Sequence, residues 1–469
     1  MTHLNPLPLS IEKLPETYQD CLDFFFARNQ FAIKLGLDII HALLEKLGRP
    51  DAGMIFLHVA GTNGKGSVCA NLAALLKATG RKRIGLYTSP HLVSFRERIL
   101  VDHEPIPSVF ILDWLRRAHG FILELNATYF ECVTALALDY FKSKECEVIV
   151  LETGLGGRLD ATNAVLPALT VITSISLDHT TILGDTVEAI WGEKIGILKP
   201  AVPMVVQESA PHLLQVLRTK ASEFASPVFA LDQNAWSRFG DSDLQFHGRY
   251  ATYTLPSSLR PESHQVKNLA LSLLAMEVFL SGPLPPGEAL LPFLTNAKLP
   301  GRTQLLQSQN CKPVLLDGAH NPGGMDALAA YIHKEFPHRN ILALFAVMRD
   351  KDYLEVFRQV LTFADQVGFI SLEKKFPRAL PYSELVAGLS KEEQAKVISF
   401  NPNPISIDEI LKNRTKEKMD SETLEMQKAD LVVVCGSLYL LGEVIPMLLP
   451  YFKDLSWFRQ FLMDGEIGK

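Results

Sequence analysis

The chain has 469 residues, of which 47% are hydrophobic and 21% are charged, a composition typical of a globular protein with two or three domains. Its formal net charge of -6 argues against a nucleic-acid partner, although a local basic site for an anionic substrate is compatible with it. The N-terminus lacks a secretory-signal pattern, no apolar run is long enough to cross a membrane, and the six cysteines form no CxxC pair, so we expect a cytoplasmic protein with reduced, buried thiols.

The N-terminal part combines a helical pattern with a strand that leads into a second helix. Apolar residues recur at helical spacing over residues 30–48, and residues 54–59 are apolar and partly β-branched. Val68, Leu72 and Leu76 then recur at helical spacing until Gly80, which ends the helix. The pattern therefore predicts a buried strand followed at once by a helix N-terminus.

The loop between this strand and this helix has the residues needed to bind phosphate. Residues 58–67 read HVAGTNGKGS, and the three glycines allow backbone N–H groups to converge on an anion that the helix dipole also favours. Lys65 adds a mobile positive charge, and Ser67 adds a hydroxyl for Mg²⁺. The loop is a shortened variant, because Val59 stands where the common pattern has its first glycine. A glycine-rich turn without a ligand is the alternative, but it requires all these features to coincide by chance.

Three further strand candidates are each followed by polar residues. The strands are expected at residues 84–87, 148–151 and 169–175, separated by helical patterns, which predicts a mainly parallel sheet. Ser89, Glu152 and His179 come after these strands, where loops at the carboxyl ends of parallel strands gather ligands. An isolated Glu or His is more often a structural residue, but the shared strand-end placement favours a metal or phosphate site.

A domain boundary is expected near residue 300, where Pro and Gly are frequent, which divides the chain into residues 1–297 and 298–469. Strands expected at 313–316, 341–347, 366–371, 396–400 and 430–435 alternate with helical segments and predict a second, smaller α/β unit. Its loop at residues 315–324 carries Asp317 and His320 and could bind a nucleotide from the other side. The loop at 433–439 is as well explained by a tight turn, and the charged segment 412–428 by solvation.

Together these segments resemble the folylpolyglutamate synthase and dihydrofolate synthase family of the Mur ligase superfamily. The resemblance spans nearly the full length and is specific because many motifs occur in one order: HVAGTNGKGSV, LYTSPHL, FRERI, TYFE, LETGLGGRLDATN, SLDHT, EKIGILKP, HQVKNLA, PGR, LLDGAHNPGG and VCGSLYLLGEV. It implies an α/β fold in which an N-terminal P-loop ATPase domain with a mainly parallel sheet is followed by a smaller C-terminal Rossmann-like domain. ATP would bind between the two domains.

The resemblance also implies roles for individual residues. Those matched to ATP binding are Thr62, Asn63, Gly64, Lys65, Gly66, Ser67, Asn268, Arg302, Asp317 and His320. Those matched to Mg²⁺ are Ser67, Ser89, Glu152 and His179, and those matched to the pterin substrate are Thr128, Tyr129, Phe130, Glu131, Leu159, Asp160 and Ala161. Composition alone makes Lys194 an ordinary solvated charge, but it matches a lysine that CO₂ converts to a carbamate. Lys65, Lys194 and His320 are therefore the expected catalytic residues, although Trp191, Gly192 and Ile195 depart from the family pattern beside Lys194.

The activity implied by the resemblance is ATP-dependent amide formation through an acyl phosphate. L-Glutamate would be added to dihydropteroate and to reduced folates, with ATP and Mg²⁺ as further partners and no membrane or nucleic acid; we expect a monomer. Folylpolyglutamate synthase activity alone is an alternative, and a Mur-type ligase acting on a cell-wall precursor is disfavoured by TSPHL and LETGLGGRLDATN. A nucleotide switch without ligase activity would leave Glu152, His179 and Lys194 unexplained.

Overall fold

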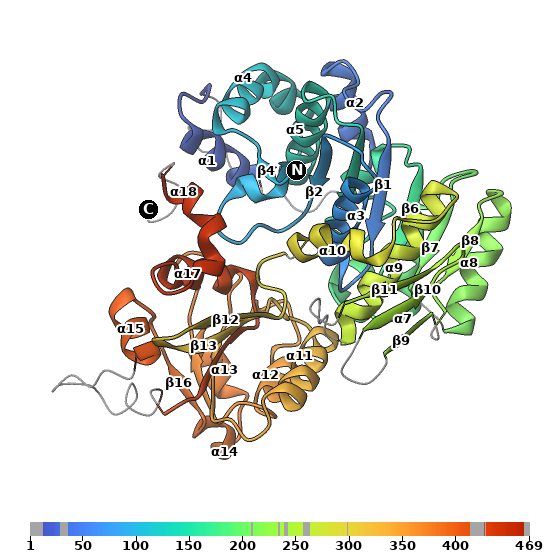
Figure 1. The fold of residues 1–469 in the computed structure, drawn as a ribbon. Coiled ribbons are helices and arrows are strands. Elements are labelled where there is room, and N and C mark those ends of the chain that lie inside the picture. The colour runs from blue at the N-terminus through green and yellow to red at the C-terminus, as the bar shows by residue number, and fades with distance from the viewer. Residues whose placement is uncertain are drawn as a thin grey trace.

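The structure is a computed structural model that describes residues 13–28, 36–207, 210–232, 235–238, 243–256, 263–297, 299–412, 426 and 428–463. These residues form two α/β lobes, one above the other in Figure 1, built on an eight-stranded and a six-stranded sheet. The prediction of an α/β fold with a mainly parallel sheet is confirmed. Residues 30–35 of the first expected helix, Lys298 at the expected boundary and most of the charged segment 412–428 lie outside the described residues.

The larger sheet places one strand, β1, at the centre of the lobe. The strands lie in the order β4-β3-β2-β5-β1-β6-β7-β8, and all neighbouring pairs are parallel except β2–β3 and β3–β4. Their bounds are β1 Phe56–Ala60, β2 Ile84–Tyr87, β3 Ile99–Val101, β4 Glu104–Pro105, β5 Val148–Glu152, β6 Leu169–Ile172, β7 Met204–Val206 and β8 Val228–Ala230. The loop that follows β1 therefore lies between the loops that follow β5 and β6.

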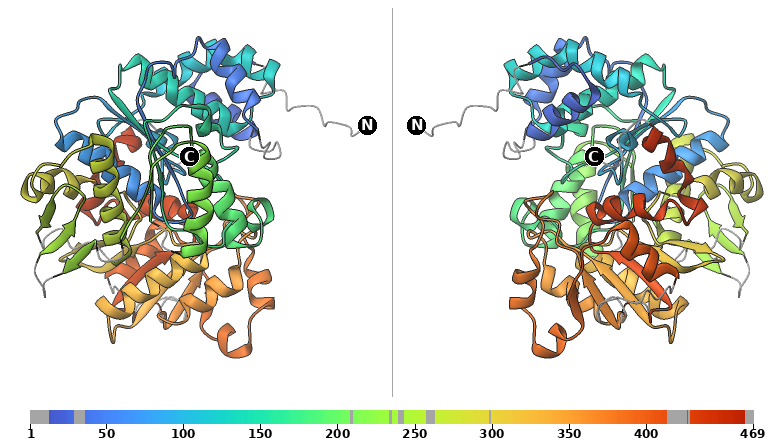
Figure 2. Two further views of the ribbon diagram at one scale, coloured as in Figure 1. Left: turned by 90° about the vertical axis from the view of Figure 1, so that its right-hand side faces the viewer. Right: turned by 90° about the vertical axis from the view of Figure 1, so that its left-hand side faces the viewer.

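Helices cover both faces of this sheet because its strands are apolar on both sides. Phe56 and Ile149 face one core with α1 (Tyr18–Arg28), α2 (Asp38–Lys46), α4 (Ser108–Leu125) and α5 (Tyr129–Ser143). Leu57 and Val150 face the opposite core with α3 (Lys65–Ala78), α9 (Ser263–Leu280) and α10 (Gly287–Asn296). Figure 2 shows these helices on opposite sides of the sheet. The alternation of side chains along each strand thus divides the lobe into two apolar layers.

The rest of the N-terminal lobe includes a small antiparallel sheet that the sequence reading did not predict. Its order is β11-β10-β9, with β9 Trp236–Arg238, β10 Leu244–His247 and β11 Thr252–Leu255. Phe246 and Tyr253 from this sheet join the core on α9. The remaining helices are η1 Phe95–Arg98, η2 Ala161–Ala164, α6 Thr180–Leu183, α7 Val187–Lys194, η3 Ile195–Ile197 and α8 Pro211–Glu223.

The smaller lobe is a six-stranded sheet in the order β12-β13-β17-β14-β15-β16, with only β12 antiparallel. The strands are β12 Gln304–Ser308, β13 Cys311–Leu316, β14 Ile341–Phe345, β15 Gln366–Phe369, β16 Val397–Ser399 and β17 Leu431–Cys435. The helices are α11 Pro322–Glu335, α12 Tyr353–Val360, α13 Tyr382–Ala387, α14 Lys391–Gln394, α15 Pro404–Lys412, α17 Leu438–Leu448, η5 Lys453–Phe458 and α18 Arg459–Met463. Leu92 and Val93 of the larger lobe pack against this lobe's core, where α17 and α18 rise toward the larger lobe in Figure 1.

The thiols follow the expectation drawn from composition. All six cysteines are unpaired, and every one except Cys311 is buried. In the part of the chain that the structure describes, no helix combines the length and the apolarity needed to cross a lipid bilayer.

Candidate active site

The loop after β1 adopts a backbone shape that only glycine allows at its first position. Gly61 has φ +147°, and a Cβ there would lie 1.8 Å from Oγ1 of Thr173. The N–H of Thr62 donates to the carbonyl of Ser174 at 2.8 Å, so the loop after β6 supports the loop after β1. Gly64, with φ +86°, occupies the N-cap position of α3. The loop therefore ends at a helix N-terminus, as a phosphate-binding loop requires.

Two polar side chains flank this loop. Nζ of Lys65 donates to the carbonyl of Thr62 at 3.2 Å, so the ammonium group folds back over the loop. Asn268 on α9 reaches the loop from the other side, since a Cβ on Gly64 would lie 2.5 Å from Oδ1 of Asn268. The structure thus brings together two of the residues expected to contact ATP, although they are far apart in the sequence.

Glu152 places a buried carboxylate beside the first turn of α3. Its side chain is 4% exposed, and Oε2 accepts the N–H of Ser89 at 3.0 Å. A Cβ on Gly66 would lie 3.7 Å from the same oxygen, and Ser67 follows Gly66 in the same helical turn. Burial raises the pKa of the Glu152 carboxyl, and the charge of Lys65 opposes this rise. A carboxylate with neighbouring hydroxyls is a donor set that fits a hard divalent cation such as Mg²⁺.

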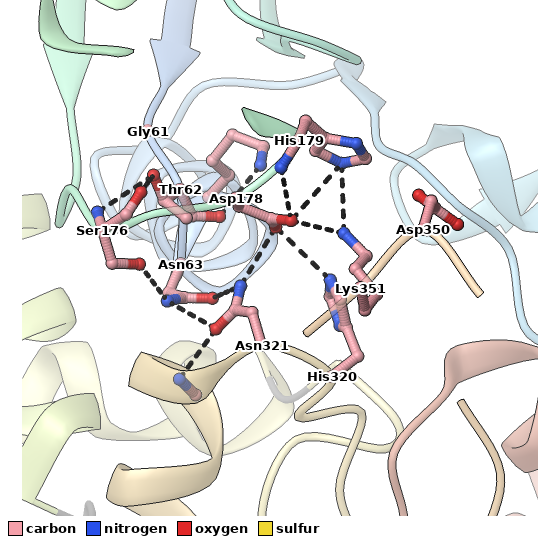
Figure 3. Close-up of polar contacts among 12 residues, drawn as sticks. Gly61, Thr62, Asn63, Ser176, Asp178, His179, His320, Asn321, Asp350 and Lys351 are labelled. Atoms are coloured by element: carbon pink, nitrogen blue, oxygen red, sulfur yellow. Dashed lines mark hydrogen bonds and ion pairs between the residues drawn. The ribbon is translucent and has the colours of Figure 1, made fainter. Parts of the chain in front are cut away.

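Asp178, which the sequence reading did not single out, connects the two lobes (Figure 3). Its carboxylate forms an ion pair with Lys351, accepts Nδ2 of Asn321 at 3.0 Å and lies 3.7 Å from Nε2 of His320. Burial alone would raise the pKa of Asp178, but the nearby His320 and the charge of Lys351 hold it well below its usual range. Asp178 is therefore ionised, and all three of these partners come from the smaller lobe.

We expect removal of the Asp178 charge to destabilise the contact between the lobes strongly. The side chains of Asp178 and Lys351 are 9% and 7% exposed, and Asp178→Asn would leave a buried ammonium without its counter-charge. Breaking such a pair costs ~3–5 kcal/mol. Urea unfolding of Asp178→Asn, Lys351→Met and the double variant checks this, because the double variant should lose less stability than the two single variants combined.

The matched control is the exposed pair of Lys375 and Glu443, whose lysine side chain is 60% exposed. Lys375→Met should change the free energy of unfolding by at most ~1 kcal/mol. Strictly additive effects of Asp178→Asn and Lys351→Met would contradict the proposed coupling between the lobes.

His179 lies in the same cluster as Asp178 and Lys351. Its Nε2 is 3.5 Å from Nζ of Lys351, and burial, together with the Lys351 charge, lowers its pKa to about 4. The imidazole is therefore neutral near pH 7, which is the form that binds metals. Among the described residues, no three His, Cys, Asp or Glu side chains form a group that could hold a metal ion.

Lys194 is buried against the phosphate loop, which overturns the interpretation of this residue as a solvated charge. It ends α7, is 4% exposed, and its Nζ donates to the carbonyl of Gly61 at 2.8 Å. Burial, assisted by the charge of Lys65, lowers the pKa of Lys194 to about 7. Trp191 beside it is also buried and donates Nε1 to the carbonyl of Leu213, so the departure from the family pattern is accommodated by packing. A large fraction of Lys194 is consequently the neutral amine near pH 7.

The expected ATP-binding residues of the smaller lobe lie on loops that Asp317 organises. One carboxylate oxygen of Asp317 accepts the N–H of Thr303 at 2.7 Å and the other accepts the N–H of Ala319 at 2.7 Å. These bonds connect the loop that carries Arg302 with the loop that carries His320, whose Nδ1–H donates to the carbonyl of Gly318 at 2.8 Å. Asp317 thus positions the two loops through bonds that its carboxylate already makes.

The segment matched to the pterin substrate forms the start of α5. Thr128 and Glu131 make a capping box, in which the N–H of Thr128 donates to Glu131 at 2.7 Å. Tyr129 stacks on Phe26 with ring centroids 5.9 Å apart. Phe130 lies against the loop after β5, because a Cβ on Gly154 would be 2.4 Å from Cζ of Phe130. The first segment expected to contact the pterin therefore packs against the glycine-rich loop that carries the second.

Asp160 in the second of these segments already has a full set of hydrogen bonds. One oxygen accepts the N–H groups of Gly154 and Leu155, at 3.0 and 2.8 Å. The other accepts both the N–H and the hydroxyl of Thr162. The carboxylate of Asp160 therefore shapes the glycine-rich loop, and a ligand at this loop would meet its backbone and the neighbouring side chains.

Comparison with known proteins identifies relatives over most of the chain. Residues 302–447 match the family described as "Dihydrofolate synthetase, C-terminal domain". A dihydrofolate synthase/folylpolyglutamate synthase of Bacillus subtilis is 34% identical over 446 residues, which cover 91% of this chain and 98% of that protein.

Solved structures agree with this result. The chain is similar to Escherichia coli FolC in complex with DHPP and ADP, with a TM-score of 0.80 and 28% identity over 93% of this chain and 99% of that chain. It is also similar to a bifunctional folylpolyglutamate synthase/dihydrofolate synthase with Mn, AMPPNP and L-glutamate bound, with a TM-score of 0.75 and 29% identity over 93% of this chain and 100% of that chain.

Proposed function

Because this chain belongs to the dihydrofolate synthase/folylpolyglutamate synthase family, we propose that it adds L-glutamate both to dihydropteroate and to reduced folates. It is an ATP-dependent ligase, like the relatives with which it shares this fold. The observation that best supports catalysis is the contact between the buried Lys194 amine and the carbonyl of Gly61, which places a reactive nitrogen against the phosphate loop. We assign ATP and folate binding to residues 1–297 and a Rossmann-like domain to 298–469.

The reaction we propose has two steps. An oxygen of the substrate carboxylate attacks the γ-phosphorus of ATP, and the bond from that phosphorus to the β,γ-bridging oxygen breaks, releasing ADP and leaving an acyl phosphate. The amine nitrogen of L-glutamate then attacks the acyl carbon, phosphate departs with its oxygen, and the amine loses a proton. The phosphate-loop N–H groups, Lys65, Arg302 and His320 would position and stabilise the phosphates, because this chemistry depends mainly on position and charge.

A divalent cation would offset phosphate charge during the first step. Solved relatives contain Mn together with AMPPNP, and we propose that this chain uses Mg²⁺ held by Ser67, Ser89, Glu152 and His179. Lys65 and its loop would then contact the phosphate oxygens that the cation leaves free.

We further propose that Lys194 reacts with CO₂. Its neutral amine would attack the carbon of CO₂, forming an N–C bond and releasing a proton, which converts a cationic side chain into a carbamate anion. The pKa of about 7 supports this step, because only the neutral amine has the required lone pair. The carbamate would help to hold the cation and the phosphate that is transferred.

We place the pterin at residues Thr128 to Glu131 and at the loop of Leu159, Asp160 and Ala161. The contact of Phe130 with Gly154 in the same loop supports a single binding region for dihydropteroate and for reduced folates. A monomeric state and a cytoplasmic location complete the proposal.

A product assay tests the proposed function. Purified protein with ATP, Mg²⁺ and L-glutamate is offered dihydropteroate and tetrahydrofolate in separate reactions, and products are identified by mass spectrometry. Both acids should gain a glutamyl group with stoichiometric release of ADP. Extension of tetrahydrofolate alone would restrict the activity to folylpolyglutamate synthesis. ATP hydrolysis that is independent of glutamate and of either acid would reject the ligase proposal.

A further inference from the structure

The FRERI motif provides a buried cation that the proposed mechanism does not use. Arg98 ends η1 and is 7% exposed. Its Nε donates to Nδ1 of His91 at 2.8 Å, and its guanidinium carbon lies 5.5 Å from the centroid of the Tyr129 ring. Arg98 is thus held in place by an imidazole nitrogen and an aromatic face, neither of which carries a negative charge.

Arg98 forms no salt bridge within the described part of the chain, although its charge opposes the rise in pKa that burial causes at the Glu97 and Glu152 carboxyls. The adjacent carboxylate, Glu97, accepts the N–H groups of Leu92, Val93 and Ser94 instead. The hydroxyl of Tyr129 is also buried without a hydrogen-bond partner, in a side chain that is 8% exposed. Buried charges and buried hydroxyls are normally paired, because an unpaired group loses its hydration without compensation. A ligand that brings an anionic acceptor would satisfy both groups.

The position of Arg98 limits what this ligand can be. Tyr129 belongs to the segment proposed to contact the pterin, and His91 lies two residues after Ser89 on the loop beside Glu152. The N–H of Thr88 donates to the carbonyl of Arg98 at 3.0 Å, which fixes Arg98 to the same loop. An anion at Arg98 would therefore lie between the pterin segment and the proposed cation site, at the level where an acid must meet the γ-phosphate.

We propose that Arg98 and Tyr129 bind the carboxylate of the pteroyl substrate and orient one of its oxygens toward ATP. This inference rests on the proposed function and adds residues that determine specificity for a free acid. The planar guanidinium matches a carboxylate, and a hydrogen bond to a charged group contributes about 1.5–3 kcal/mol. The phosphates of ATP are a less suitable partner, because the β1–α3 loop and Lys65 already serve them.

The test is a double-mutant cycle in which the Arg98 side chain and the carboxylate of the ligand are changed separately and together. Wild-type protein and Arg98→Gln are titrated by calorimetry, with AMPPNP present, using dihydropteroate and the analogue in which its carboxylate is a carboxamide. Wild type should bind the acid about 10- to 100-fold more tightly than the amide. Arg98→Gln should lose most of this preference while binding the amide as wild type does. Tyr129→Phe should lose a smaller part of the preference.

Several results would overturn the proposal. Equal weakening of acid and amide binding by Arg98→Gln would show a structural role, and so would the absence of any preference in wild type. If Arg98→Gln raises the KM for glutamate and leaves the affinity for dihydropteroate unchanged, the site binds glutamate instead. The cycle measures binding and does not depend on turnover. A protein that binds dihydropteroate but forms no amide would therefore reject the proposed function, and the role of Arg98 could still be tested. A protein that does not bind dihydropteroate at all would reject both the proposed function and the proposed role of Arg98.

Two variants serve as controls. Arg117→Gln removes an arginine on α4 that is 60% exposed and pairs with Asp139, so acid preference should be unchanged. Arg98→Lys keeps the charge but loses the planar pair of donors, so it should retain part of the acid preference. Thermal unfolding of each variant shows whether a lost preference comes from a lost fold.

Discussion

Lys65→Met is expected to impair nucleotide use itself, with the affinity for AMPPNP falling roughly 10- to 100-fold. Lys65 begins α3 directly behind Gly64, and its Nζ already folds over the loop toward the carbonyl of Thr62 at 3.2 Å. Methionine has a similar length but lacks the charge, so the backbone N–H groups of the loop would remain while the mobile cation is lost. Calorimetric titration with AMPPNP measures the affinity for the nucleotide, and an assay of ADP release measures turnover.

Lys77→Met is the matched control for this variant, because Lys77 is on the same helix and pairs with Asp102 at the opposite end. It should bind AMPPNP as wild type does. Normal nucleotide affinity in a folded Lys65→Met protein would show that the loop does not use this lysine for phosphate, and the assignment of the β1–α3 loop would have to be revised.

The parallel strands could be predicted from the sequence because each carries its own signal. Residues 84–87 are apolar on both sides and coincide with β2, and residues 54–59 correspond to β1 with a shift of one or two residues. The strand expected at 169–175 is shorter in the structure and ends at Ile172. The hydroxyls of Thr173 and Ser174 donate to the carbonyl of Asn63, so these two residues serve the phosphate loop.

The antiparallel sheet β11-β10-β9 carried a weaker signal. Its strands have three or four residues, and β10 alternates buried and less buried positions over only Leu244–His247. The partner that stabilises this sheet is distant in the sequence: Glu277 on α9 accepts the hydroxyl of Tyr253 at 2.8 Å. A short alternation with a distant partner cannot be distinguished from a loop by periodicity alone.

The candidate site, like the fold, has parts that could be predicted from the sequence and parts that could not. The phosphate loop is contiguous, so its order of strand, glycines and helix could be recognised directly. Lys194 was misjudged by composition because its burial depends on Gly61, which is 133 residues away. Asp178 and Lys351 are 173 residues apart, and neither has a local pattern that predicts their pairing. A carboxylate directly before His179, in the loop after the expected strand, was the available clue to Asp178.

Lys194→Ala is expected to lose most turnover while keeping its affinity for AMPPNP. The side chain contacts the loop through a single bond to the carbonyl of Gly61, so its removal leaves the phosphate-binding N–H groups in place. Lys194→Arg should be equally inactive, because a guanidinium stays protonated and cannot take up CO₂. Lys391→Ala, at an exposed position in α14, should retain full activity. Steady-state kinetics and AMPPNP titration of the three variants separate turnover from binding.

The pH dependence distinguishes a carbamate from a simple amine. The pKa of Lys194 is lowered from 10.5 to about 7, so the reactive neutral form increases as pH rises through 7 and the protonated form predominates below it. Incorporation of ¹³C-labelled CO₂, followed by NMR, should therefore rise from pH 6 to pH 8 in wild type and be absent in Lys194→Ala. Turnover should fall in CO₂-depleted buffer and recover when bicarbonate is added. The carbamate proposal would be rejected if the turnover of the folded wild-type enzyme did not depend on CO₂, or if Lys194→Ala were fully active. The buried amine would then have only a structural role beside Gly61.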